Sequence, residues 1–135
     1  MYRNILVPVA FDNEDKAKAA IAVAQGLAAH DAAITLLHVV EQIPGYVMAY
    51  VPPGHVAEQR KTMQADLDAL AAGVPGAGAV LVDGHSGRTI LDYAEAKSSD
   101  LIVIASHRPG MADMLIGSTA AQVVRHATCA VHVLR

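Results

Sequence analysis

The sequence predicts an α/β domain with a doubly wound, five-stranded parallel sheet and helices on both faces, and two observations carry that prediction. First, short apolar runs alternate along the chain with Ala-rich stretches that are typical of helices. Second, the apolar runs are nearly continuous, as in strands that helices cover on both faces. No repeat or internal linker interrupts the alternation, so we expect one domain spanning residues 1–135.

Two strands frame the first helix. Residues 4–9 form an apolar strand, and Pro8 must lie at its end because proline cannot donate a ladder hydrogen bond. The cap-like residues 12–15 precede a helix over 16–29, and a second strand follows over 33–40. The side chains expected to face inward from this helix are Ala20, Ile21, Val23, Ala24 and Leu27.

Residues 41–54 hold three prolines and two glycines, so we expect a long loop there, with a flap as one possible role. A helix is expected over 55–72, with Met63, Leu67 and Leu70 facing inward.

The C-terminal half contains the remaining elements. Ser86 is a candidate N-cap for the helix that begins at Arg88, and Cys129 is either a small buried residue or a redox thiol. The expected elements are strands over 79–83, 100–105 and 129–134 and helices over 88–97 and 119–126.

Right-handed crossovers restrict the topology of such a sheet. We expect the strand order 3-2-1-4-5, in which the first and fourth strands are neighbours. Ligands of open parallel sheets bind beyond the carboxyl ends of the strands, at the point where the order reverses. The loops over 8–12 and 105–117 should then face each other across one crevice.

Composition argues against several partners and locations. A formal charge of −3 gives no support for nucleic acid or an anionic membrane. The apolar run over 5–11 is too short to span a bilayer, and no signal peptide is visible. The single Cys129 excludes an intrachain disulfide and a cysteine-built metal site, and it makes the cytoplasm the default location. The histidines lack ligand spacing, so we expect no metal site built by the protein.

The most specific segment runs from Ala105 to Thr119, between an apolar strand and a helix that opens with Gly117 and Ser118. A helix N-terminus presents unpaired N–H groups and a partial positive charge, so it can hold a phosphate. Nucleotide binding is therefore the first functional hypothesis.

Common phosphate-handling motifs do not account for this segment. The chain has no G-x4-G-K-[ST] string, and no glycine-rich turn follows the first strand. A phospho-acceptor receiver domain has the same architecture, with Asp12 and Asp83 as candidate acidic residues, but it needs a lysine after the last strand, where none stands. No serine lies in a G-x-S-x-G elbow, and we expect no efficient catalysis.

Taken together and in order, several segments resemble the universal stress protein family along nearly the whole chain. They are residues 4–8, 34–39, 82–84, 100–104, 117–127 and 131–134. The resemblance implies an adenine nucleotide, ATP, in the crevice, at most slow hydrolysis, and a role in the stress response. Bound Mg²⁺ would be held mainly by phosphate oxygens and water.

The family's nucleotide-binding members carry G-x2-G-x9-G-[ST] in the last loop. Gly117 and Ser118 match its final pair, whereas Ala105 and Arg108 stand at the first two glycines and the last spacer has eight residues. The string Ser-His-Arg-Pro over 106–109 resembles a subgroup of the family. Arg108 is a candidate for bidentate pairing with a phosphate.

A second departure lies after the first strand. Ala10 stands where those members have an aspartate, and Asp12 is a candidate substitute; by resemblance, the backbone of Val39 contacts the adenine edge. The residues expected at the nucleotide are Pro8, Val9, Ala10, Asp12, Val39, Ala105, Ser106, His107, Arg108, Gly110, Gly117, Ser118 and Thr119.

Each candidate also has a purely structural interpretation. Gly117 and Ser118 could simply begin a self-capped helix, Arg108 could be a solvated loop charge, Asp12 could cap the first helix, and His107 could bond to backbone.

The resemblance further implies a homodimer that pairs the C-terminal edge strand through Val131 and Val133. The alternative function is a nucleotide-free interaction module of the same family. A third is a regulatory subunit that uses residues 43–53 as its contact surface, a segment equally suited to be a lid.

Overall fold

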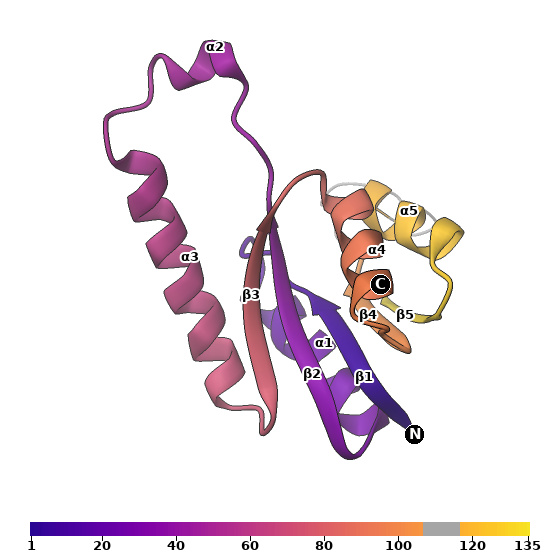
Figure 1. The fold of residues 1–135 in the computed structure, drawn as a ribbon. Coiled ribbons are helices and arrows are strands. Elements are labelled where there is room, and N and C mark those ends of the chain that lie inside the picture. Colours follow the sequence, from indigo (N-terminus) through magenta and orange to yellow (C-terminus); the bar gives the residue numbers. More distant parts are fainter. Residues whose placement is uncertain (107–116) are drawn as a thin grey trace.

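The computed structural model describes residues 1–106 and 117–135. Its strands are β1 (Tyr2–Pro8), β2 (Ala28–Val40), β3 (Ala77–Asp83), β4 (Leu101–Ala105) and β5 (Ala130–Leu134). Its helices are α1 (Glu14–Leu27), α2 (Gly45–Met48), α3 (His55–Ala72), α4 (Ser86–Ala96) and α5 (Ser118–His126). All strand pairs are parallel and the order is β3-β2-β1-β4-β5, which confirms the predicted fold class and strand order (Figure 1).

Two hydrophobic cores cover the two faces of the sheet. The first joins the sheet to α1 and α3, and the second joins it to α4 and α5. Figure 1 shows α1 behind the strands and α4 and α5 in front of them. The helix residues buried in the first core are Ala17, Ala20, Ile21, Ala24 and Leu67, and those in the second are Ile90, Ala94, Ala120 and Val123.

Strand β1 explains why its sequence is continuously apolar. Ile5, Leu6 and Val7 are all fully buried, yet Ile5 and Val7 belong to the first core and Leu6 to the second. Side chains alternate across a strand, so a strand covered on both faces needs apolar residues at every position. β1 ends at Pro8, as predicted.

Side-chain hydrogen bonds join the start of β1 to the residues just before β4, at the end of the sheet remote from the expected crevice. The carboxylate of Asp100 accepts hydrogen bonds from the backbone N–H groups of Arg3 (2.8 Å) and Asn4 (3.0 Å). The Asn4 side chain donates to the carbonyl of Lys97 at 2.6 Å. These bonds hold together two strands that are distant in sequence and whose carboxyl ends frame the site.

The structure corrects two expectations near the ends of elements. β2 begins at Ala28 rather than at residue 33, and its pairing with β1 shifts register between Tyr2 and Asn4. Asp31 takes a left-handed conformation (φ 63°) there, which aspartate tolerates better than most residues. Ser86 does not cap α4, because it is the first residue of that helix and its hydroxyl donates to Glu41 at 3.1 Å.

Residues 41–54 are not wholly a loop. They contain the four-residue helix α2, which begins after Pro44 and projects beyond the end of the sheet (Figure 1). Pro44 is its N-cap residue, and the carbonyl of Pro44 accepts from the N–H groups of Val47 (2.9 Å) and Met48 (3.1 Å). A single turn of this length is too short to give a periodic sequence signal. Tyr46 and Tyr50 are exposed, so this segment adds no residues to the core.

Candidate functional site

A cleft of about 300 Å³ opens at the carboxyl ends of β1, β2 and β4, between the first turns of α1 and α5. β1 and β4 are neighbours in the sheet, but β1 leads to α1 on one face and β4 leads toward α5 on the other. The chain therefore leaves the two strands in opposite directions, which opens a crevice of the kind that binds ligands in parallel sheets.

Most of the residues predicted for the site line this cleft. They are Pro8, Val9, Ala10, Asp12, Val39, Ala105, Gly117, Ser118 and Thr119. Ser106 is buried beside the cleft rather than in its lining. His107, Arg108 and Gly110 lie outside the described residues, and so does Pro109, the last residue of the Ser-His-Arg-Pro string.

The N-terminus of α5 meets the cleft without a side-chain cap. Its N-cap residue is Gly117, which has no side chain to accept from the first N–H groups of the helix. The adjoining Ser118 and Thr119 line the cleft. The first backbone donors of a helix have no intrahelical partners, so this arrangement suits an anion.

Ser106 secures the entrance to this helix from β4. Its hydroxyl accepts a hydrogen bond from the backbone N–H of Gly117 at 2.8 Å, and its own N–H donates to Leu134 at 2.7 Å. Only 7% of the residue is exposed. Ser106 thus joins the end of β4, the end of β5 and the start of α5.

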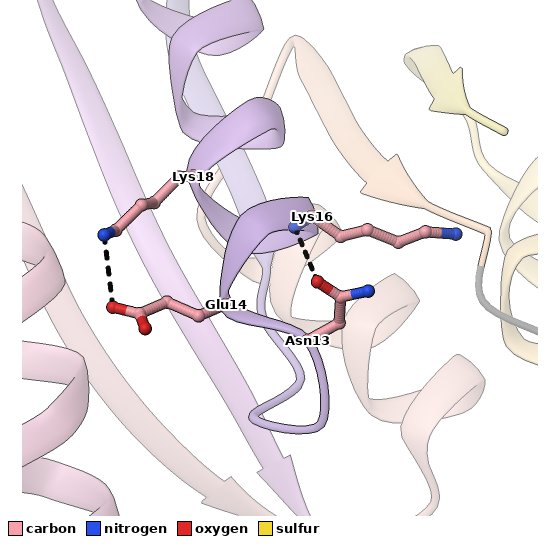
Figure 2. A network of polar contacts seen from close by, with 4 residues as sticks. All are labelled: Asn13, Glu14, Lys16 and Lys18. Atoms are coloured by element: carbon pink, nitrogen blue, oxygen red, sulfur yellow. Dashed lines mark hydrogen bonds and ion pairs between the residues drawn. The ribbon is translucent and has the colours of Figure 1, made fainter.

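The first turn of α1 forms the opposite wall and brings a cation to the cleft. Asn13 caps the helix by accepting from the backbone N–H of Lys16 at 3.1 Å. The Nζ of Lys16 then donates to the backbone oxygen of Ser106 at 2.8 Å. Figure 2 shows the Lys16 side chain extended away from the helix, on the side opposite to Lys18 and Glu14. The predicted alternative role of Asp12, a helix cap, is therefore filled by Asn13.

His38 supports the floor of the cleft at the carboxyl end of β2. Its Nδ1 lies 2.6 Å from the backbone oxygen of Val9, and because a carbonyl only accepts, Nδ1 carries the proton. The ring also packs against Phe11, with 4.5 Å between centroids. These contacts fix the loop after β1 against β2.

Sequence reasoning missed several residues that line the cleft, namely Asn13, Lys16, His38, Ser86 and Ile90. One signal was available for Lys16. A cation in the first turn of a helix opposes the helix dipole, so its presence there calls for a reason outside the helix. The contact with Ser106, distant in sequence, could not be read from the pattern.

The described lining contains two charged side chains, those of Asp12 and Lys16. Within residues 1–106 and 117–135, no group of three or more His, Cys, Asp or Glu side chains is placed to hold a metal ion. In the same part of the chain, no helix is both long and apolar enough to cross a membrane. Burial raises the pKa of the Cys129 thiol, which lies outside the cleft.

Comparison with known proteins identifies relatives over the full length of the chain. A model of the universal stress protein family matches residues 1–135. A protein from Thermus aquaticus, named "Universal stress protein in QAH/OAS sulfhydrylase 3'region", is 34% identical over 141 residues and covers 100% of both chains.

Solved structures share the fold. The universal stress protein UspA from Lactobacillus plantarum matches with a TM-score of 0.71 and 32% identity, over 99% of this chain and 98% of that chain. The universal stress protein from Archaeoglobus fulgidus in complex with dAMP matches with a TM-score of 0.68 and 15% identity, over 99% of this chain and 98% of that chain.

Proposed function

Because the chain belongs to the universal stress protein family, we propose that it binds an adenine nucleotide, ATP, in the cleft between α1 and α5 and acts in the stress response. The observation that carries the proposal is the position of the uncapped N-terminus of α5 in the wall of the cleft. The volume of about 300 Å³ is at the small end of the range for small-molecule pockets. The complex of the Archaeoglobus fulgidus protein with dAMP supports the class of ligand.

The proposed orientation follows the chemistry of the lining. The adenine lies at the carboxyl end of β2, where Val39 offers backbone groups to its edge. Asp12 accepts from the ribose hydroxyls, and the phosphates lie at Gly117 and Ser118, where the dipole of α5 favours negative charge. Ala10 and Ala105 contribute close backbone approach, since their side chains are small.

The proposal also includes predicted residues and a metal ion whose positions the structure does not describe. His107, Arg108 and Gly110 belong to the proposed phosphate loop, and Ser106 accepts a hydrogen bond from the N–H of Gly117. Mg²⁺ enters with ATP, bound to phosphate oxygens and water. The cytoplasmic location, the lack of efficient catalysis and the lack of nucleic-acid binding stay predictions.

The first experiment looks for nucleotide that purifies with the protein. The protein is prepared without added nucleotide and denatured, and the filtrate is examined for adenine absorbance and identified by chromatography. ATP is then titrated by calorimetry into the wild type, Gly117→Val and Gly45→Val. Gly45 is a matched control because the space around its Cβ position is open and it does not line the cleft.

We expect the wild type and Gly45→Val to bind ATP and Gly117→Val to lose binding, because a valine at the helix start obstructs the cleft. Absence of heat from the wild type at millimolar ATP contradicts the nucleotide proposal. Equal binding by wild type and Gly117→Val contradicts the assignment of the cleft wall.

We also propose a homodimer that pairs β5 across a two-fold axis. β5 is an edge strand, so one row of its N–H and C=O groups lacks a partner strand among residues 1–106 and 117–135. Val131 and Val133 are half-buried and alternate with the exposed His132. Size-exclusion chromatography with light scattering tests the state, and Val133→Pro should give a monomer because proline removes a ladder donor.

The second candidate function is a nucleotide-free interaction module, favoured by two exposed aromatic side chains, one in α2 and one just after it. Tyr46 is 78% exposed and Tyr50 is 86% exposed. Such side chains are typical of contact surfaces. A partner captured by the wild type and by Gly117→Val, but not by a Tyr46→Ser/Tyr50→Ser variant, would favour this function.

A further inference from the structure

Lys16 is a positively charged group at the phosphate end of the cleft, and no family motif identified in the sequence contains it. Building on the proposed nucleotide site, we propose that Lys16 binds the ligand's phosphate and makes the cleft select phosphorylated adenosine over adenosine. The class of ligand thereby becomes more specific: an adenine nucleotide whose phosphate reaches α1 as well as α5.

The geometry rests on Ser106, which contacts both walls of the cleft. Its backbone oxygen accepts from Nζ of Lys16 at 2.8 Å, and its hydroxyl accepts from the N–H of Gly117 at 2.8 Å. The ammonium group of Lys16 and the N–H of Gly117, the N-cap residue of α5, therefore both contact the same residue, Ser106. Two sources of positive potential, one formal charge and one helix dipole, converge on the same end of the cleft.

The hydrogen-bond chemistry leaves Lys16 able to bind an anion. A lysine ammonium has three N–H donors, and the contact with Ser106 uses one of them. The acceptor is a neutral carbonyl, which does not cancel the charge. The ion pairs found among residues 1–106 and 117–135 include Lys18 but not Lys16.

The position of Lys16 is unfavourable for the helix that carries it. The residue stands in the first turn of α1, where the dipole favours the acidic Glu14 and Asp15 and disfavours a cation. Its long side chain resolves this conflict by extending to Ser106, away from the helix (Figure 2). A residue that opposes its local preference yet is held by a distant contact is expected at functional sites.

Lys18 provides the matched control. It lies on the same helix, carries the same charge and pairs with Glu14 at 3.2 Å on the exposed side. The experiment measures the affinity of adenosine, AMP and ATP by calorimetry for the wild type, Lys16→Met, Lys16→Arg and Lys18→Met. Adenosine reports on the integrity of the cleft, since it lacks the charge that Lys16 is proposed to bind.

We expect Lys16→Met to bind ATP at least about tenfold more weakly, with a smaller loss for AMP and a change of less than about twofold for adenosine. Lys16→Arg retains the charge and should stay within about threefold of wild type for ATP. Lys18→Met should bind all three ligands as the wild type does. Raising the salt concentration should weaken ATP binding more in the wild type than in Lys16→Met.

The outcomes separate this inference from the function on which it rests. If the wild type binds ATP and Lys16→Met binds it equally well, the role of Lys16 is overturned and the nucleotide proposal stands. Equal losses for adenosine and ATP in Lys16→Met also overturn it, because they indicate a purely structural lysine. If the wild type binds none of the three ligands, both proposals fail.

Discussion

Helices α1 and α5 both begin at the cleft, but they differ in N-terminal capping and in the charge of their first turns. α1 is capped by the side chain of Asn13 and carries Glu14 and Asp15 in its first turn. α5 follows the N-cap residue Gly117, which offers no side-chain cap, and its first turn holds no acidic residue. α1 thus has a side-chain cap and acidic residues that complement its dipole, whereas the described residues give α5 neither a side-chain cap nor an acidic first turn.

The missing side-chain cap of α5 lowers the stability of the fold only slightly. A glycine N-cap is only a few tenths of a kcal/mol less favourable than a capping side chain, whereas alanine costs about 1 kcal/mol. Ser106 compensates further, because its buried hydroxyl accepts from the N–H of Gly117. The start of α5 is therefore held by Ser106, the residue that follows β4, while Ser118 and Thr119 in its first turn line the cleft.

The largest effect is expected when α5 is given a charged side-chain cap. Gly117→Asp should weaken ATP binding about 100-fold, or about 3 kcal/mol, because a carboxylate both occupies the helix donors and repels phosphate. The backbone at Gly117 (φ −63°, ψ 155°) accepts any residue without strain. Calorimetry measures the affinity, and thermal melting should show a folded protein.

Gly45→Asp is the control for the added charge, since Gly45 lies in α2 and outside the cleft lining. It should bind ATP as the wild type does. Wild-type affinity in Gly117→Asp would show that the two helix starts do not differ in function.

The next effect concerns the support beneath α5. Ser106→Ala removes the acceptor of a buried N–H group, so the free energy of unfolding should fall by about 1–3 kcal/mol. Urea denaturation measures it, with Ser98→Ala at an exposed position as the control. A loss no larger than that of the control would mean that Gly117 does not depend on Ser106.

Much of the fold could be predicted from the sequence because its signals are local and periodic. The uninterrupted apolar runs indicated a sheet covered on both faces, and the helix over 55–72 has the predicted bounds. Even the strand order followed, since the fold class and its right-handed crossovers leave few alternatives. The start of β2 was missed because residues 28–33 join the strand through a register shift, which has no apolar signature.

The site was less predictable because its contacts join distant segments. Gly117 and Ser118 could be found from a motif within one loop. Lys16 could not, since its role depends on a contact with Ser106, 90 residues away. Asn13 rather than Asp12 caps α1. The sequence alone could not show which of the neighbouring cap-like residues 12–15 is the N-cap.

A smaller effect is expected from removing the cap of α1. Asn13→Ala should lower the free energy of unfolding by about 1 kcal/mol, and Asn13→Asp should retain the stability of the wild type because aspartate caps equally well. Urea denaturation of the three proteins checks this. A stability equal to wild type in Asn13→Ala would contradict the contrast between the two helices.

The smallest effect belongs to the exposed side of α1. Glu14 and Lys18 form an i,i+4 pair with side chains 71% and 63% exposed, so the pair should contribute only about 0.3–0.5 kcal/mol. Glu14→Gln loses in addition a carboxylate that favours the helix N-terminus, worth about 0.3–1 kcal/mol, so the contribution of the pair has to be measured separately. A double-mutant cycle with Lys18→Met isolates the pair, and its coupling should disappear in high salt. None of these variants should alter ATP affinity, because the pair points away from the cleft (Figure 2); a gain of affinity in Glu14→Gln, or a loss in Lys18→Met, would show that charge on either side of α1 reaches the ligand and that Lys16 has no special position.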